Sequence, residues 1–179
     1  MALVSLSSKR SNLLGVLALS RPRNLAIAAL TLLLIRYGWM TRWVTGGVHL
    51  QTSVVHVFEA TLVMVLLMAA GNIINAYLDV QEDRINRPQR ALVDRTVKRR
   101  VLIVTHQVLN LIGLLVAAHL SWSVGSIGPL ILAIMVSWIL WRYSASWKAK
   151  PLIGNLSIAF LLGMVPLWLA SLEAAGAGP

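Results

Sequence analysis

Residues Gly71–Pro88, GNIINAYLDVQEDRINRP, place an amide and two carboxylates at the end of a membrane-length apolar run. Asn75, Asp79 and Asp83 are four residues apart, slightly more than one helical turn, so on a helix their side chains share one face. A carboxylate in a membrane span costs about 2.5–3.5 kcal/mol on insertion scales, so such residues usually serve a function. Oxygen ligands this close together suit Mg²⁺, which completes its shell with water and phosphate oxygens. The stretch therefore predicts a magnesium site at the end of a transmembrane helix.

The composition is that of a membrane protein. Hydrophobic residues make up 58% of the 179 residues, charged residues only 12%, and the mean hydropathy is +0.75, far from the values of a soluble domain. The net charge of +10 is explained by cytoplasmic loops and anionic membrane lipids, so we expect no nucleic acid partner. The chain has no cysteine, which excludes disulfides, thiolate metal sites and a cysteine nucleophile.

Five apolar segments are close to the length needed to cross the hydrocarbon core, about 17–25 residues. They are Asn24–Met40, His56–Leu78, Val101–Leu120, Ile127–Tyr143 and Leu152–Leu172. We therefore expect an all-α, polytopic transmembrane bundle of about five spans. Residues 1–23 are expected to form a cytoplasmic N-terminal or interfacial segment, and residues 24–179 a transmembrane domain.

The basic residues orient these spans, because loops dense in Lys and Arg alternate with loops that have few. Under the positive-inside rule, the N-terminus and the 84–100 loop are cytoplasmic. The same side then gathers polar residues that flank the spans: Asn24, Asp79, Asp83, Tyr143, Lys148 and Asn155. Each one alone is explained as an interfacial anchor or a helix cap. Their convergence on one membrane face favours a binding site.

The ingredients of this site suit a ligand with a diphosphate head and a long hydrocarbon tail. Mg²⁺ and arginine would neutralise charge that develops on a departing diphosphate, and arginine binds phosphate oxygens bidentately. The tail would lie between helices, and an acceptor would capture the allylic cation that remains. The alternative for the arginine-rich 84–100 loop is a solvated patch that binds lipid headgroups.

Four short motifs follow one another along the chain. They are Arg21-Pro22-Arg23-Asn24; Asn75, Asp79 and Asp83 with Arg84 and Asn86-Arg87-Pro88; Tyr143-Ser144 with Lys148; and Gly154-Asn155. In this order and between spans of this length, they resemble the UbiA superfamily of intramembrane prenyltransferases over essentially the whole chain. Within that superfamily, RPRNL, LIRYG and DVQEDRINRP look most like geranylgeranylglycerol-phosphate geranylgeranyltransferases.

The resemblance implies a helical bundle with a central cavity open toward the cytoplasm. It implies Mg²⁺-dependent transfer of an isoprenyl group from a prenyl diphosphate to a lipid or aromatic acceptor, and in the subgroup geranylgeranyl transfer to a glycerol-phosphate-type acceptor. Asn75, Asp79 and Asp83 would be the catalytic residues that bind the metal and the diphosphate. The further candidate substrate contacts are Asn24, Asn72, Arg84, Arg87, Tyr143, Lys148 and Asn155.

The chain departs from the family's pattern in two ways. Ala76 stands where the family commonly has an aspartate, which removes a carboxylate that could orient the metal ligands. The family also has about nine helices and a second acidic motif, whereas the only acidic residue beyond Lys150 is Glu173. We therefore interpret the chain as the N-terminal portion of a prenyltransferase, completed by missing C-terminal helices or by a complementing chain.

Two alternatives remain for the function. One is a prenyltransferase of quinone or heme biosynthesis, and the other is a non-catalytic lipid-binding or transporter-like protein. Transporters place acids or broken helices near the midplane of the bilayer, which disfavours the second alternative.

Outside the motifs, His56 and Glu59 are expected to pair at the interface, and His106 and His119 to make buried polar contacts. Glu173–Pro179 are expected to lie in an external loop.

Overall fold

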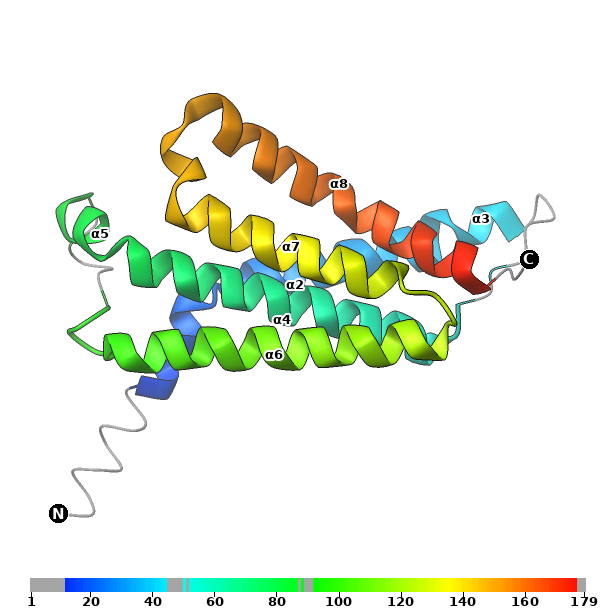
Figure 1. Ribbon diagram of the computed structural model, residues 1–179, viewed down its shortest axis with the longest axis horizontal. Coiled ribbons are helices and arrows are strands. Elements are labelled where there is room, and N and C mark those ends of the chain that lie inside the picture. The colour runs from blue at the N-terminus through cyan, green and yellow to red at the C-terminus, as the bar shows by residue number, and fades with distance from the viewer. Residues whose placement is uncertain (1–11, 45–49, 51, 87, 89–91, 177–179) are drawn as a thin grey trace, which may run out of the picture.

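The computed structural model describes residues 12–44, 50, 52–86, 88 and 92–176, and these form a bundle of helices (Figure 1). Pairing of β type within these ranges is limited to one isolated bridge between Val93 and Val97. A short N-terminal helix, Asn12–Leu19, precedes the labelled elements. These are α2 (Pro22–Leu34), η1 (Ile35–Trp39), α3 (Thr41–Val44), α4 (Val54–Leu78), α5 (Val80–Asn86), α6 (Arg99–Ser123), α7 (Gly128–Ala145), η2 (Trp147–Ala149) and α8 (Pro151–Gly176).

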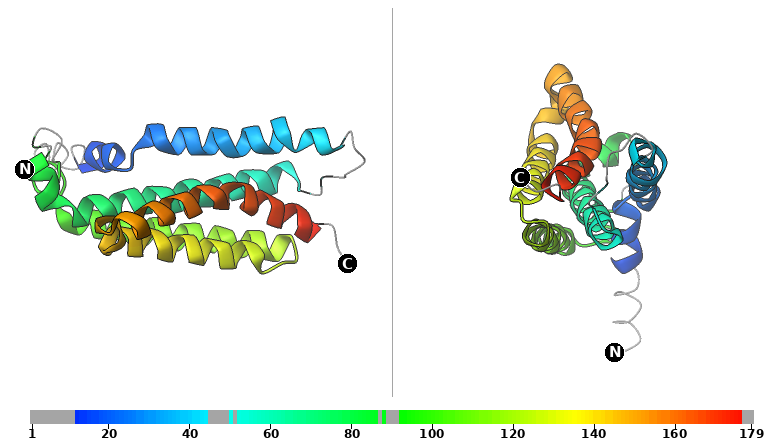
Figure 2. Two further views of the ribbon diagram at one scale, coloured as in Figure 1. Left: turned by 90° about the horizontal axis from the view of Figure 1, so that it is seen from above. Right: turned by 90° about the vertical axis from the view of Figure 1, so that its right-hand side faces the viewer.

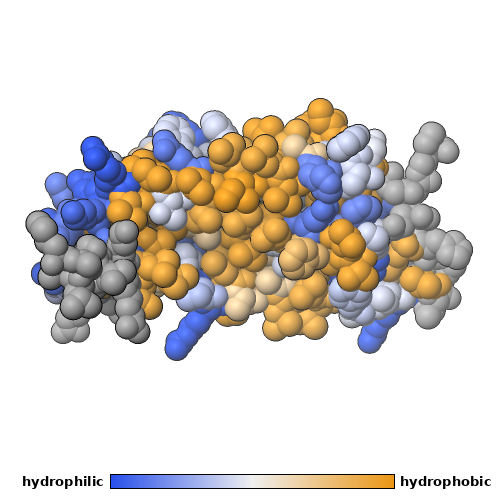
Figure 3. All heavy atoms as spheres, turned by 90° about the horizontal axis from the view of Figure 1, so that it is seen from below, coloured by the Kyte–Doolittle hydropathy of each residue, from blue (hydrophilic) through white to orange (hydrophobic). Residues whose placement is uncertain are grey.

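Four of these helices, α4, α6, α7 and α8, are long and apolar enough to cross a membrane. The N-terminal helix and the stretch Pro22–Trp39 form a pair bent by 48°, which gives a fifth span if the pair is taken as one. The prediction of about five spans in an all-α bundle is therefore confirmed. The ends of the last four spans differ from the predicted ones by a few residues, whereas the first candidate span also takes in Asn12–Leu19, which was assigned to the N-terminal segment. On one face of the molecule, apolar side chains occupy the middle and polar side chains lie toward both ends, as expected for a membrane-spanning bundle (Figure 3).

Local sequence signals account for several helix ends. Ser53 caps α4, because its Oγ accepts a hydrogen bond of 3.2 Å from the backbone N–H of His56. Proline opens α2 and α8 and lies in the first turn of α7, where its missing N–H leaves no bond unmade. Asp79 ends α4 with a backbone conformation of φ −85° and ψ 10°, and the chain then starts α5 at Val80. The single helix expected through the acidic motif is therefore broken at Asp79.

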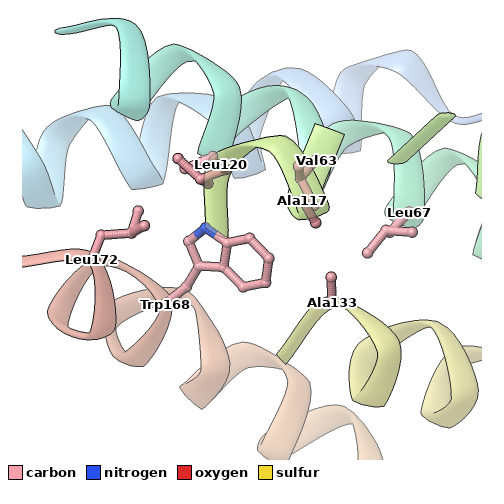
Figure 4. Close-up of a cluster of buried hydrophobic side chains, with 8 residues drawn as sticks. Val63, Leu67, Ala117, Leu120, Ala133, Trp168 and Leu172 are labelled. Carbon is pink, nitrogen blue, oxygen red and sulfur yellow. The ribbon is translucent and has the colours of Figure 1, made fainter. Parts of the chain in front are cut away.

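The core lies where α4, α6, α7 and α8 meet (Figure 4). Its buried residues are Ala60, Val63, Leu67, Ala117, Leu120, Ala133, Trp168 and Leu172. Glycines let the helices approach closely, as is usual in membranes. A Cβ on Gly71 would lie 3.1 Å from the methyl carbons of Leu140, and one on Gly113 would lie 3.0 Å from Leu67.

A chain of polar contacts crosses the inside of the bundle. Nδ1 of His106 on α6 lies 3.0 Å from the carbonyl oxygen of Ala70 on α4. The amide nitrogen of Asn110 lies 3.2 Å from the imidazole of His106, and the amide oxygen of Asn110 accepts a hydrogen bond of 2.6 Å from Ser137 on α7. The polar contact expected for His106 is present, with the ring partly buried. A buried contact was also expected for His119, but its side chain is 60% exposed, so that expectation is wrong.

Glu59 takes a different partner from the one that the sequence predicted. Its carboxylate lies 3.0 Å from Nδ1 of His119 on α6, so the expected pair with His56 is wrong. The physical reason is that α4 packs along α6, which brings the two helix faces together over their length.

At the end of the bundle remote from Asp79, Arg36 and Glu173 form a buried ion pair, with Nε and Oε1 3.0 Å apart. Arg36 also donates a hydrogen bond of 2.8 Å to the carbonyl of Thr52, whose N–H donates one of 3.1 Å to Glu173. The expectation that Glu173 lies in an external loop is wrong, because α8 continues through it and the ion pair holds it in the bundle.

Candidate functional site

A cavity of about 530 Å³ lies between α2, α4, α7 and α8. α8 is inclined to the other helices: its start stands off from α4 and its end approaches it, as the views in Figures 1 and 2 agree. Most of the wall is apolar and is contributed by Val63, Met64, Leu67, Met68, Val136, Leu140, Leu161, Leu162, Met164, Val165 and Trp168. The polar lining residues gather at the ends of α4 and α7 and the start of α2: Arg21, Asn24, Asn72, Asn75, Asp79, Tyr143 and Lys148. We call this polar end the mouth of the cavity.

The last turns of α4 carry the central pair of the mouth. Asn75 donates a hydrogen bond of 2.7 Å from Nδ2 to Oδ2 of Asp79, one turn further along. The other amide atom, Oδ1 of Asn75, is buried and has no hydrogen-bond partner among the described residues. Asn72 donates a hydrogen bond of 2.8 Å to the carbonyl of Ser20, which ties α4 to the bend before α2. The amide of Asn75 is thus oriented by Asp79 while its oxygen stays available.

Lys148 comes to the same place from the turn between α7 and α8. Its Nζ forms an ion pair with Oδ1 of Asp79 and lies 3.8 Å from Oε2 of Glu82. Partial burial lowers the pKa of Lys148 from its ordinary value, because desolvation disfavours the ammonium. The negative charge of Asp79 is therefore compensated by Lys148, which lies 69 residues further along the sequence.

The turn that carries Lys148 is fixed by aromatic contacts from α7. The rings of Trp138 and Trp147 meet edge to face with centroids 5.5 Å apart. The guanidinium of Arg142 lies 5.6 Å from the centroid of the Trp147 ring, within the range of a cation–π contact.

Of the ten predicted site residues, Asn75, Asp79 and four of the candidate substrate contacts line the cavity. Asn24, Tyr143 and Lys148 line the mouth, as the convergence on one face predicted, and so does Asn72, which was named only from the family resemblance. Asp83, Arg84 and Asn155 do not line the cavity. Arg84 is exposed and paired at 3.0 Å with Asp94, Asn155 is exposed on the first turn of α8, and Arg87 lies outside the described residues.

The position of Asp83 follows from the break at Asp79. α5 is held against the 84–100 loop, because Val80 is buried with Val93 and Val97. The helix axis therefore changes after Asp79, and the shared face expected of a continuous helix ends there. Within the described residues, no three His, Asp or Glu side chains come together as a metal site.

Two polar lining residues were not named as contacts from the sequence. Arg21 lines the mouth from a left-handed backbone conformation, φ 58° and ψ 61°, directly before Pro22. Ser144, the residue after Tyr143, is buried in the wall. Both belong to quoted motifs, so the only signal available was their place beside the residues that were named.

Comparison with known proteins places this bundle in a family. The chain matches the UbiA prenyltransferase family over residues 25–178. It is 39% identical over 111 residues to digeranylgeranylglyceryl phosphate synthase of Methanosarcina mazei, which covers 62% of this chain and 37% of that protein. The synthases of Methanoregula boonei and Thermococcus gammatolerans are 32% and 35% identical, each over 50% of their own length and 86% and 84% of this chain. The chain spans about half the length, or less, of the curated relatives it matches.

A solved structure gives the same picture of the fold. It concerns digeranylgeranylglyceryl phosphate synthase in membranes and superimposes with a TM-score of 0.71 at 24% identity, covering 90% of this chain and 53% of that one. The resemblance noted from the four motifs is thus confirmed, and the apolar helices are those of an integral membrane protein. By its family match, its relatives and its fold, the chain belongs to the UbiA prenyltransferase family.

Proposed function

We propose that this chain binds a prenyl diphosphate and serves in the transfer of its isoprenyl group, preferably geranylgeranyl, to a glycerol-phosphate-type lipid acceptor. The observation that supports this most directly is the cavity, which has ionic and amide groups at its mouth and an apolar wall beyond them. A ligand with a charged head and a hydrocarbon tail matches both parts.

The residues at the mouth fit a magnesium ion. The unpartnered Oδ1 of Asn75 is buried next to the carboxylate of Asp79, and both are hard oxygen donors of the kind that Mg²⁺ takes. Asn75 and Asp79 would hold the metal, whereas Asp83 lies on α5 outside the cavity lining. When bound, Mg²⁺ supplies positive charge that stabilises a departing diphosphate.

The protein's own side chains perform the remaining binding. Lys148 and Arg21 provide cations at the mouth, and Tyr143 and Asn24 provide hydrogen-bonding groups for phosphate oxygens. The apolar wall holds the tail and excludes water from the carbon that reacts. In the transfer, the allylic C–O bond to the diphosphate breaks, and the hydroxyl oxygen of the acceptor forms the new C–O bond. Its proton passes to solvent, and diphosphate leaves.

The names of the relatives support the choice of donor and acceptor. A digeranylgeranylglyceryl phosphate synthase makes a product with a second geranylgeranyl group on a glycerol phosphate. We further propose that the mouth, the N-terminus and the 84–100 loop face the cytoplasm, as the distribution of basic residues predicts. Transfer, unlike donor binding, is proposed to need further helices, from the same polypeptide or from a complementing chain.

The test is a binding titration of the 179-residue chain in lipid nanodiscs with labelled geranylgeranyl diphosphate. We expect saturable binding that requires Mg²⁺, and competition by inorganic pyrophosphate but only weakly by geranylgeraniol. Binding without metal, or equal competition by the alcohol, would contradict the proposal. Adding geranylgeranylglyceryl phosphate or an aromatic acceptor in a membrane that contains the complementing helices then distinguishes the acceptor class by the product formed.

A further inference from the structure

We infer that Gly154 is a positioning residue that aims Lys148 at Asp79. This inference rests on the proposed function, because it gives the Lys148–Asp79 pair its role at the mouth of the cavity. Gly154 lies in the first turn of α8, one residue before the exposed Asn155. Neither residue of the Gly154-Asn155 motif lines the cavity, so contact with substrate does not explain the glycine.

The space around Gly154 is closed by backbone rather than by flexible side chains. A Cβ on this residue would lie 3.0 Å from the carbonyl oxygen of Trp147, 3.4 Å from Cα of Lys148 and 3.5 Å from the carbonyl oxygen of Lys148. The helix therefore packs directly onto the turn that carries Lys148. Any larger residue at position 154 must push this turn or the start of α8 away.

The turn has little freedom to yield in another direction. The carbonyl of Trp147 accepts a hydrogen bond of 2.9 Å from the N–H of Lys150, and the carbonyl of Lys150 accepts one of 2.8 Å from the N–H of Gly154. On the opposite side, Trp138 and Arg142 hold the Trp147 ring. The turn is thus clamped between α7 and α8, and the direction of Lys148 toward Asp79 depends on both contacts.

The chain contains a matched control on the same helix. Gly163 also lies inside α8, but a Cβ placed there meets no atom within 4 Å. Alanine is a better helix former than glycine at both positions. Gly154→Ala and Gly163→Ala therefore make the same chemical change, and only the first disturbs the turn.

The first experiment needs no ligand and reads the position of Lys148 directly. Amine-reactive labelling followed by mass spectrometry should show low reactivity at Lys148 in the wild-type chain and higher reactivity in Gly154→Ala. Gly163→Ala should leave Lys148 unchanged, and the exposed Lys98, which lies outside this turn, serves as the internal standard in each sample. Equal labelling of Lys148 in wild type and Gly154→Ala would overturn the inference.

The second experiment asks whether Gly154 acts only through Lys148. We expect Gly154→Ala to weaken Mg²⁺-dependent pyrophosphate binding by about tenfold or more, as for residues that orient metal ligands. In a Lys148→Met background, the same substitution should have no further effect, because coupled residues are not additive. A full additional loss in that background would show a general structural role and overturn the inference.

These experiments distinguish a failure of the proposed function from a failure of the role inferred for Gly154. If the wild-type chain binds no pyrophosphate, the proposed function fails, while the labelling result still decides the role of Gly154. If Gly154→Ala does not fold, Trp147→Ala loosens the same turn from the side of α7 without adding an atom. It should raise the labelling of Lys148, and unchanged labelling there would also overturn the inference.

Discussion

Arg36 and Glu173 join the end of the first span to the last turns of α8 through a buried ion pair, with Nε and Oε1 3.0 Å apart. Their side chains are only 8% and 12% exposed, so both charges are largely shielded from solvent and lipid. The backbone of Thr52, just before the start of α4, forms hydrogen bonds with both Arg36 and Glu173 and so connects α4 to the ion pair. The end of the bundle opposite the mouth is therefore held by charge as well as by packing.

Breaking this pair from one side should strongly destabilise the chain. Arg36→Met leaves the Glu173 carboxylate buried without its cation, at an expected cost of about 3–5 kcal/mol in the free energy of unfolding. Thermal unfolding in detergent measures the change. The double variant Arg36→Met with Glu173→Met removes both charges and should recover most of the loss. A double variant as unstable as the single one would contradict the role assigned to the pair.

Asp79→Asn should abolish the proposed metal site without removing volume. It replaces the carboxylate that Asn75 and Lys148 contact, and we expect Mg²⁺-dependent pyrophosphate binding to weaken by more than about 100-fold, roughly 2.7 kcal/mol. Isothermal titration calorimetry on the chain in nanodiscs measures it. Asp94→Asn is the matched control, because Asp94 pairs with Arg84 on the exposed loop and its left-handed φ of 65° suits asparagine. Equal binding by both variants and the wild type would remove Asp79 from the site.

Lys148→Met should shift two affinities in opposite directions. Lys148 occupies an oxygen of Asp79 that a metal would take, so its loss should tighten the binding of Mg²⁺ alone, by about 10-fold or 1.4 kcal/mol. The same change removes a cation that would meet phosphate oxygens, so pyrophosphate should bind more weakly at saturating Mg²⁺. Separate titrations of the metal and the anion check this, with the exposed Lys150→Met as control. A parallel change in both affinities would contradict a direct contact with each ligand.

Filling the cavity should separate the binding of the tail from that of the head. Ala28 on α2 lines the cavity, and Ala28→Trp should block the hydrocarbon tail while leaving the mouth open. We expect geranylgeranyl diphosphate to bind at least about 10-fold more weakly, a loss of about 1.4 kcal/mol, and inorganic pyrophosphate to bind as in the wild type. Ala26→Trp, on the exposed side of the same helix, is the control. If Ala28→Trp leaves the lipid diphosphate unaffected, the tail lies elsewhere.

The spans and the convergence of the mouth residues could be predicted because both depend on local properties. A helix that crosses hydrocarbon needs about 20 apolar residues, and the basic residues mark which ends share a membrane face. These two rules brought Asn24, Asp79, Tyr143 and Lys148 to one end, where the structure places them around one cavity.

The details that failed depend on packing between distant segments. The spacing of Asn75, Asp79 and Asp83 fits a continuous helix, but the helix breaks at Asp79, and Val80 beyond the break is buried with Val93 and Val97. His56 is closer to Glu59 in the sequence, but the packing of α6 against α4 brings His119 to Glu59 instead. The close packing of Gly154 onto the turn before α8 could not be predicted either. It depends on the backbone carbonyl of Trp147, which would lie only 3.0 Å from a Cβ at position 154, and the sequence pattern carries no information about such a backbone contact.

The contacts that link Ala70, His106, Asn110 and Ser137 have a consequence for assembly. Hydrocarbon offers no replacement for a lost hydrogen bond, so turning α6 by one residue, about 100°, would strand several polar groups at once. The three helices can therefore adopt only one rotational setting relative to one another. Once α4, α6 and α7 have inserted, these contacts therefore set how α6 is turned against its two neighbours.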